Sequence, residues 1–138
     1  MSITAAIYSK LSATTAITDI VGAEIWPNIL PQDARGIEKL PAIMFEMVTN
    51  PQDHNMGTDD TPEHPTFSIH SYAQAYNTAD NIRIQVITAL KDFSGAVSGT
   101  SITFQRIFIN DVYDQYISET GTHDLIVNVI AWANRLIV

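Results

Sequence analysis

The chain has 138 residues, a formal net charge of −8 and no cysteine. The lack of cysteine excludes disulfides, thiolate metal sites and cysteine nucleophiles. The acidic balance argues against binding to nucleic-acid phosphates or anionic membranes, which needs clustered Lys and Arg. The length predicts a single domain spanning residues 1–138.

Hydrophobic residues make up 46% of the chain and charged residues only 16%. The charged fraction is below the usual value of about 25%. Uncharged polar side chains or subunit interfaces must therefore cover part of the surface. The sequence shows no basic segment followed by an apolar run, as in a secretion signal, and no apolar run near the ~18 residues of a membrane span. We therefore expect folding in a cytoplasm, without a membrane segment.

The first segment is predicted to be helical. Ile3, Ile7 and Leu11 recur at i, i+4 spacing, which places them on one helix face. A second short helix is expected over residues 16–21, and Gly22 is well placed to end it, because glycine readily takes the left-handed conformation of a helix C-terminus.

Alternation of apolar and polar residues predicts strands in the rest of the chain. Pro27 and Pro41 fit this pattern, because proline favours extended backbone before it and is tolerated at the first residue of a strand. The expected strands are 24–27, 41–49, 66–74, 102–109, a continuation at 112–117 after a break, and 123–134.

The longest helix is expected between the third and fourth strands. Its apolar residues form one stripe at helical spacing. Asn77 or Thr78 can cap its start, Gly95 is the expected residue after its end, and residues 94–101 read as a loop of small residues. The stripe consists of Ala79, Ile82, Val86, Ala89, Leu90 and Phe93.

These elements predict an α+β fold with a mixed, mostly antiparallel sheet and helices packed on one face. The turn at 120–122 is short, so the last two strands must pair antiparallel. The last strand carries apolar residues on both faces, which predicts that both faces are buried. Helices account for one side, and a neighbouring subunit could account for the other.

Residues 50–65 form the longest polar stretch, and their prolines and short polar side chains predict an irregular loop. Asp53 and Asn55 imitate the start of an EF-hand calcium loop, but Thr58 stands where that loop requires glycine. His54, His64 and His70 could form a zinc site with Asp59 or Asp60. The two loop histidines lack a fixed spacing, however, and His70 lies on a predicted strand. We therefore expect solvated loop side chains, with no metal and no cofactor.

A catalytic reading rests on Asp111 and Asp114, which flank Tyr113. Two carboxylates can perform acid–base chemistry when their environments drive the pKa values apart. Charged residues at a strand break are also a common way to blunt a sheet edge. No known catalytic motif accompanies them, so we expect a structural role and predict that the chain is not an enzyme.

The order of several segments resembles the small tail-completion proteins of long-tailed bacteriophages, also called tail-terminator or head–tail joining proteins. The resemblance covers nearly the whole chain, although each motif is weak by itself. Asp111-Val112-Tyr113 and a final strand close the pattern. The earlier segments are Ile7-Tyr8-Ser9-Lys10-Leu11, Ile20-Val21-Gly22-Ala23-Glu24-Ile25-Trp26-Pro27, Leu30-Pro31-Gln32, Leu40-Pro41-Ala42-Ile43-Met44-Phe45-Glu46 and Phe67-Ser68-Ile69-His70-Ser71-Tyr72.

The resemblance implies a virion structural protein at the head–tail interface, made in the host cytoplasm. Such proteins form a ring, usually hexameric, that caps the tail tube and meets the head-connector proteins. DNA would pass through the ring without specific binding, which suits an acidic subunit. The alternatives are a head-completion or stopper protein of the connector, a small enzyme or ligand-binding domain, and a cellular adaptor.

The resemblance implies no catalytic residues. The long polar loop becomes a candidate contact arm, and Trp26 a candidate anchor, because aromatic residues are enriched where interfaces bind most strongly. The candidate interface residues are Trp26, Asp53, His54, Met56, Asp59, Asp60, Glu63 and His64.

Overall fold

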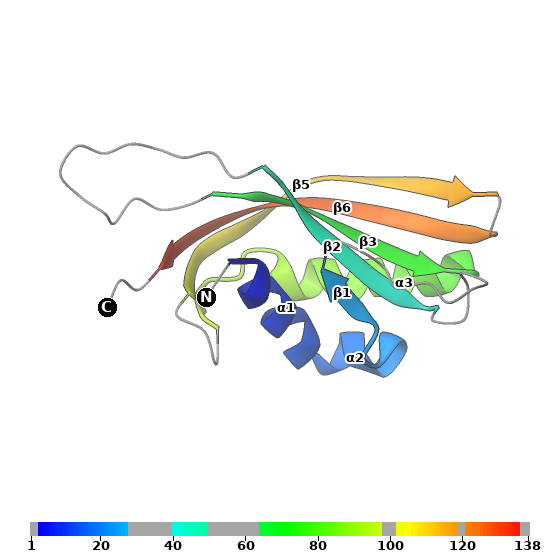
Figure 1. Ribbon diagram of the computed structural model, residues 1–138, viewed down its shortest axis with the longest axis horizontal. Helices are drawn as coiled ribbons and strands as arrows, with labels where there is room; N and C mark the ends of the chain where they lie inside the picture. Colours follow the sequence, from blue (N-terminus) through cyan, green and yellow to red (C-terminus); the bar gives the residue numbers. More distant parts are fainter. Residues whose placement is uncertain (1–2, 28–39, 50–63, 98–101, 119–120, 136–138) are drawn as a thin grey trace.

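The fold is taken from a computed structural model, which describes residues 3–27, 40–49, 64–97, 102–118 and 121–135. This part of the chain forms a strongly bent sheet with helices beneath it (Figure 1). Within it, no helix is long and apolar enough to cross a membrane. The elements are α1 (Ile3–Ala13), α2 (Thr15–Val21), β1 (Ile25–Pro27), β2 (Ala42–Thr49), β3 (Thr66–Ala73), α3 (Tyr76–Leu90), β4 (Gly95–Ala96), β5 (Ile102–Ile117) and β6 (Thr122–Arg135).

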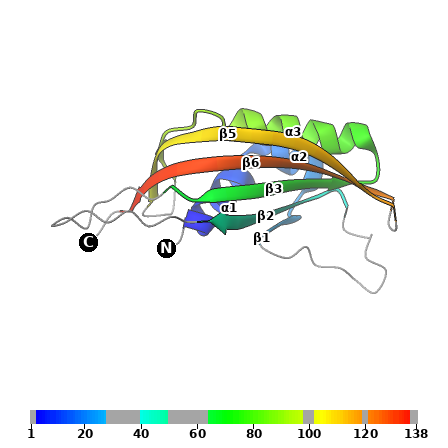
Figure 2. The ribbon, with the colours of Figure 1, turned by 90° about the horizontal axis from the view of Figure 1, so that it is seen from above.

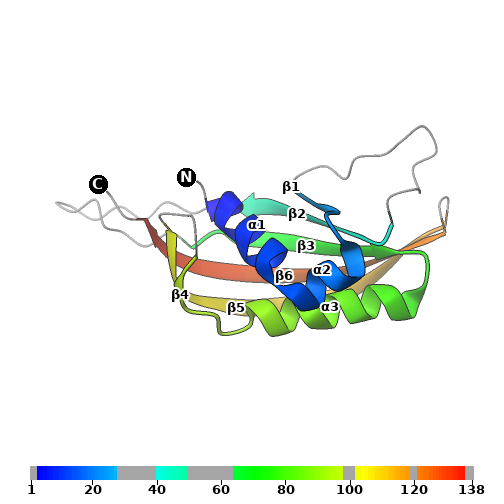
Figure 3. The ribbon, with the colours of Figure 1, turned by 90° about the horizontal axis from the view of Figure 1, so that it is seen from below.

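The six described strands form one sheet in the order β1-β2-β3-β6-β5-β4. Only β1 and β2 pair in parallel; the other neighbours pair antiparallel. The described helices lie on one face of the sheet, and the other face carries none of them (Figures 2 and 3). The predicted α+β fold with a mixed, mostly antiparallel sheet is therefore confirmed. We call the side without described helices the open face.

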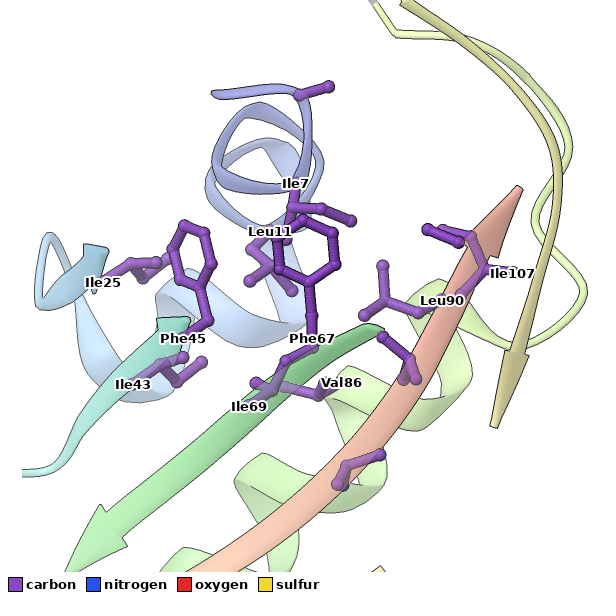
Figure 4. Close-up of a cluster of buried hydrophobic side chains, with 14 of the residues drawn as sticks. Ile7, Leu11, Ile25, Ile43, Phe45, Phe67, Ile69, Val86, Leu90 and Ile107 are labelled. Carbon is purple, nitrogen blue, oxygen red and sulfur yellow. The ribbon is translucent and has the colours of Figure 1, made fainter. Parts of the chain in front are cut away.

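The core lies between the sheet and the helices. Strand alternation directs Phe67 and Ile69 of β3 towards the helices, where both are fully buried. The predicted apolar rows of α1 and α3 pack against these two β3 residues. Ile7, Leu11 and Val86 are fully buried in the same cluster (Figure 4). The strand and helix periodicities thus identified the two surfaces of the core correctly.

The ends of α3 differ from the prediction. The helix begins at Tyr76, and its N-cap position is Ala75, which has no side chain for capping. At the other end, Asp92 takes the left-handed backbone with a φ of 59°. Gly95 instead starts β4, a short strand where a loop was expected. Packing of the apolar stripe fixes this helix more strongly than its local capping residues do.

β5 is one continuous strand rather than two. The predicted break at 110–111 appears as a register shift between Ile109 and Asp111, and a second shift lies between Phe104 and Arg106. At each shift β5 has one extra residue, which forms a bulge. The strand therefore bends but stays paired with β6. The expected hairpin turn before β6 is confirmed, since Ile117 pairs with Thr122.

Candidate functional site

Most of the predicted contact loop lies outside the described residues. That holds for Asp53, His54, Met56, Asp59, Asp60 and Glu63, whose role in an interface stays a prediction. His64 is described, and its ring stacks on Trp132 of β6 with a centroid distance of 4.5 Å. His64 is half-buried, so the expectation of a solvated side chain holds only in part, because one face of the ring packs on the Trp132 indole.

Trp26 lies on β1 and borders an open groove of about 750 Å³ between α1 and the edge of the sheet. Its indole Nε1 donates a hydrogen bond of 2.7 Å to Oε2 of Glu24, so the polar end of the ring is satisfied. The described residues that line this α1–β1 groove carry no charge. They are Thr4, Ala5, Tyr8, Ala23, Ile25, Trp26 and Pro27.

Asp111 and Asp114, the two carboxylates considered for catalysis, point to opposite faces of the sheet. Asp111 pairs with Asn128 on the open face, whereas Asp114 pairs with Leu125 on the side of the helices. Arg83 of α3 binds the Asp114 carboxylate, and its hydrogen bond holds the pKa of that carboxyl below its usual range. Asp114 is thus an ionised partner of Arg83, and this arrangement gives no support to acid–base chemistry by the pair.

Three aromatic rings meet at the end of the β5–β6 hairpin, two of them from the hairpin and one from α3. The His123 ring lies 4.8 Å from the Tyr116 ring and 5.5 Å from the ring of Tyr76, at the start of α3. Tyr76 also donates its hydroxyl to Asp114 over 3.2 Å. We call Tyr76, Tyr116 and His123 the aromatic tip. Tyr76 and Tyr116 remain 42% and 57% exposed, so these rings are held in place yet free to meet a partner.

The open face holds a polar network that the sequence did not reveal. His70 of β3 lies beside Asp124 of β6, with Nδ1 3.0 Å from each carboxylate oxygen. Because a carboxylate only accepts, Nδ1–H is the donor. Ser68 likewise donates to the Asn128 side chain over 2.5 Å. The partners are 54 and 60 residues apart in the chain, so only the β3–β6 register brings them together.

The described residues contain no group of three or more His, Asp or Glu side chains that could hold a metal ion. His70 has Asp124 on one side, while Glu46 lies 3.8 Å from its Nε2. This arrangement is a cross-strand hydrogen-bond network in the sheet, and its geometry points to stability rather than to chemistry.

Tyr72 lies beside this network and gives a testable pH dependence. Burial, followed by the negative charges of Asp124 and Glu46, raises the pKa of Tyr72 to about 12 from 10.0. The folded state therefore keeps a proton that the unfolded chain releases earlier, so stability falls as the pH rises from 10 towards 12. We expect Tyr72→Phe to show a shallower fall than the wild type in urea unfolding over this range. Equal slopes for the two proteins would contradict the assignment.

Comparisons with a set of family models and with solved structures both find proteins similar to this chain. The family model described as tail completion protein gp17 matches residues 5–134. A chain in the solved virion of a native gene transfer agent (GTA) particle has a similar fold, with a TM-score of 0.70 and 13% sequence identity. The match covers 96% of this chain and 95% of that one. A comparison with curated protein sequences gives no match.

Proposed function

This chain belongs to the tail completion protein gp17 family, and on that premise we propose that it is the tail terminator of a phage particle. Membership makes it a structural protein of the virion. In detail, we propose that identical subunits of this chain, usually six in such proteins, form a ring. This ring caps the tail tube and joins it to the head connector. The family match over residues 5–134 is the observation that carries this proposal.

The shape of the subunit supports a role in assembly. The described helices lie on one side of the sheet, and the other side offers a broad surface for partners (Figure 2). That open face carries Phe108 and Tyr113, which are 41% and 47% exposed. Aromatic residues of this kind are enriched in protein interfaces. Contacts between subunits would therefore bury part of the apolar surface that the chain exposes.

The charge of the chain supports passage of DNA without binding. The chain has fifteen acidic residues and only seven basic ones. A ring of such subunits repels the phosphate backbone, so DNA can move through its channel without being held. The same balance argues against a head-side role that depends on gripping the genome.

Particles made without this protein test the proposal. A host that carries the phage genome with this gene disrupted should yield tail tubes of irregular length and heads without attached tails, as seen by electron microscopy. Supplying the gene in trans is the control and should restore joined particles of normal length. Mass spectrometry of isolated wild-type tails should detect the protein.

Three outcomes would contradict the proposal in whole or in part. Detection on tail-less heads but not on isolated tails would identify a head-completion or stopper protein instead. Absence from complete particles would remove the structural role altogether. Tubes of normal length in the disrupted phage would contradict the terminating function, even if the joint were lost.

A further inference from the structure

The α1–β1 groove is shaped for an apolar side chain of a partner. It lies at the edge of the sheet, because β1 is the first strand in the order. Glu24 satisfies the indole Nε1 of Trp26, so the ring presents its apolar surface. Tyr8 of α1, 41% exposed, stands among the other lining residues. An open groove of about 750 Å³ with these walls is large enough to receive more than one ring.

The aromatic tip is the surface that matches this groove. Its rings are pre-organised, since Asp114 binds both Tyr76 and Arg83 and thereby ties the hairpin to α3. Rigid aromatic side chains lose little conformational entropy on binding and are enriched at interface hot spots. The acidic groups near the tip are also neutralised in part, because Arg83 binds Asp80 as well, at 2.8 Å.

Within the proposed ring, the partner of both surfaces is a second copy of this chain, and charge limits where two copies can meet. Two copies of a subunit with a net charge of −8 repel each other. A contact between copies is therefore least costly where charge is absent or already paired, as it is at the groove and near the tip. The hairpin end lies away from the start of α1 along the sheet, so one subunit cannot fill its own groove with its own tip (Figure 3).

We propose that the aromatic tip of one subunit docks in the α1–β1 groove of the next. The two surfaces differ, so the contact is head-to-tail, and repetition of such a contact closes a ring when the rotation permits. This inference rests on the proposed ring and names its contact. It assigns Trp26 to the receiving side and Tyr116 to the inserted side.

Chemical crosslinking tests the contact directly, because the chain has no cysteine of its own. Ser118→Cys places a thiol beside the tip, and Ala23→Cys places one in the groove; both positions are exposed. A short bismaleimide should convert the double variant into a ladder of covalent multimers. Each single variant should stay monomeric on a denaturing gel.

The outcomes separate this contact from the ring itself. Rings by native mass spectrometry without a ladder would overturn the contact and leave the ring proposal standing. Monomers at all concentrations, with no ladder, would count against both. A dimer from Ser118→Cys alone would indicate a symmetric tip-to-tip contact instead.

A double-mutant cycle provides a second readout. Tyr116→Ala and Trp26→Ala should each raise the dissociation constant between subunits at least about tenfold, as expected for hot-spot residues. If the side chains touch, the double variant should lose less than the product of the two effects. Ile84→Ala is the control, because Ile84 is 49% exposed on α3 outside both surfaces. Independent effects of Tyr116 and Trp26 would contradict a direct contact.

Discussion

Replacement of Phe67 with alanine is expected to lower the free energy of unfolding by about 3–5 kcal/mol. Phe67 is fully buried on β3, a central strand, and its ring points towards α1 (Figure 4). Truncation removes the ring from the cluster that contains Ile7 and Leu11 and leaves a cavity that the sheet cannot fill by moving. Because a domain of this size is stable by only about 5–15 kcal/mol, the loss is a large share of the total.

Phe108→Ala is the matched control for this prediction. The chemical change is identical, but Phe108 is 41% exposed on the open face, where its ring lies 5.1 Å from the Arg106 guanidinium. Its loss should cost less than about 1 kcal/mol, since only a partly exposed contact disappears. Urea unfolding at neutral pH measures both values. Similar costs for the two variants would show that the helices do not seal the core side of the sheet.

Asp124→Ala is expected to cost about 1–3 kcal/mol, the penalty for leaving a buried polar group without its partner. Asp124 is only 3% exposed, although it lies on the face without helices. Its removal leaves Nδ1 of His70 without an acceptor. The Nε2 atom on the other side of that ring is buried and makes no hydrogen bond within the described residues. The effect is measured by urea unfolding at neutral pH.

Two further variants sharpen the test of Asp124. Asp124→Asn keeps an oxygen acceptor for His70 and should recover part of the loss. Asp111→Ala removes an exposed carboxylate from the same face and should change stability by no more than about 0.5 kcal/mol. Equal costs for Asp124→Ala and Asp111→Ala would show that the His70 network does not stabilise the sheet.

The candidate contact surfaces were only partly predictable. Trp26 was singled out as an interface anchor from its residue type, and the structure places it at a groove, where its contact role stays a prediction. The aromatic tip was missed, because Tyr76 precedes the expected start of α3 and meets His123 only through the fold. Asp114 was noticed for the wrong reason, since its partner is Arg83 rather than Asp111.

The sequence by itself determined most of the elements and the buried side of α1, α3 and β3. Period-3.6 rows in α1 and α3 and period-2 alternation in β3 reflect local geometry, so they can be recognised without knowing the partners of each segment. The residues of several segments, in their order along the chain, resemble the tail-completion family, and the family match confirms that resemblance.

The tertiary structure alone decided which residues meet. The strand order places β6 between β3 and β5, and this register joins His70 to Asp124 across the open face. Bulges in β5 decide that Asp114 faces Arg83. Such contacts depend on pairing between distant segments, where a shift of one residue would turn every side chain to the other face. No local pattern in the sequence carries that information.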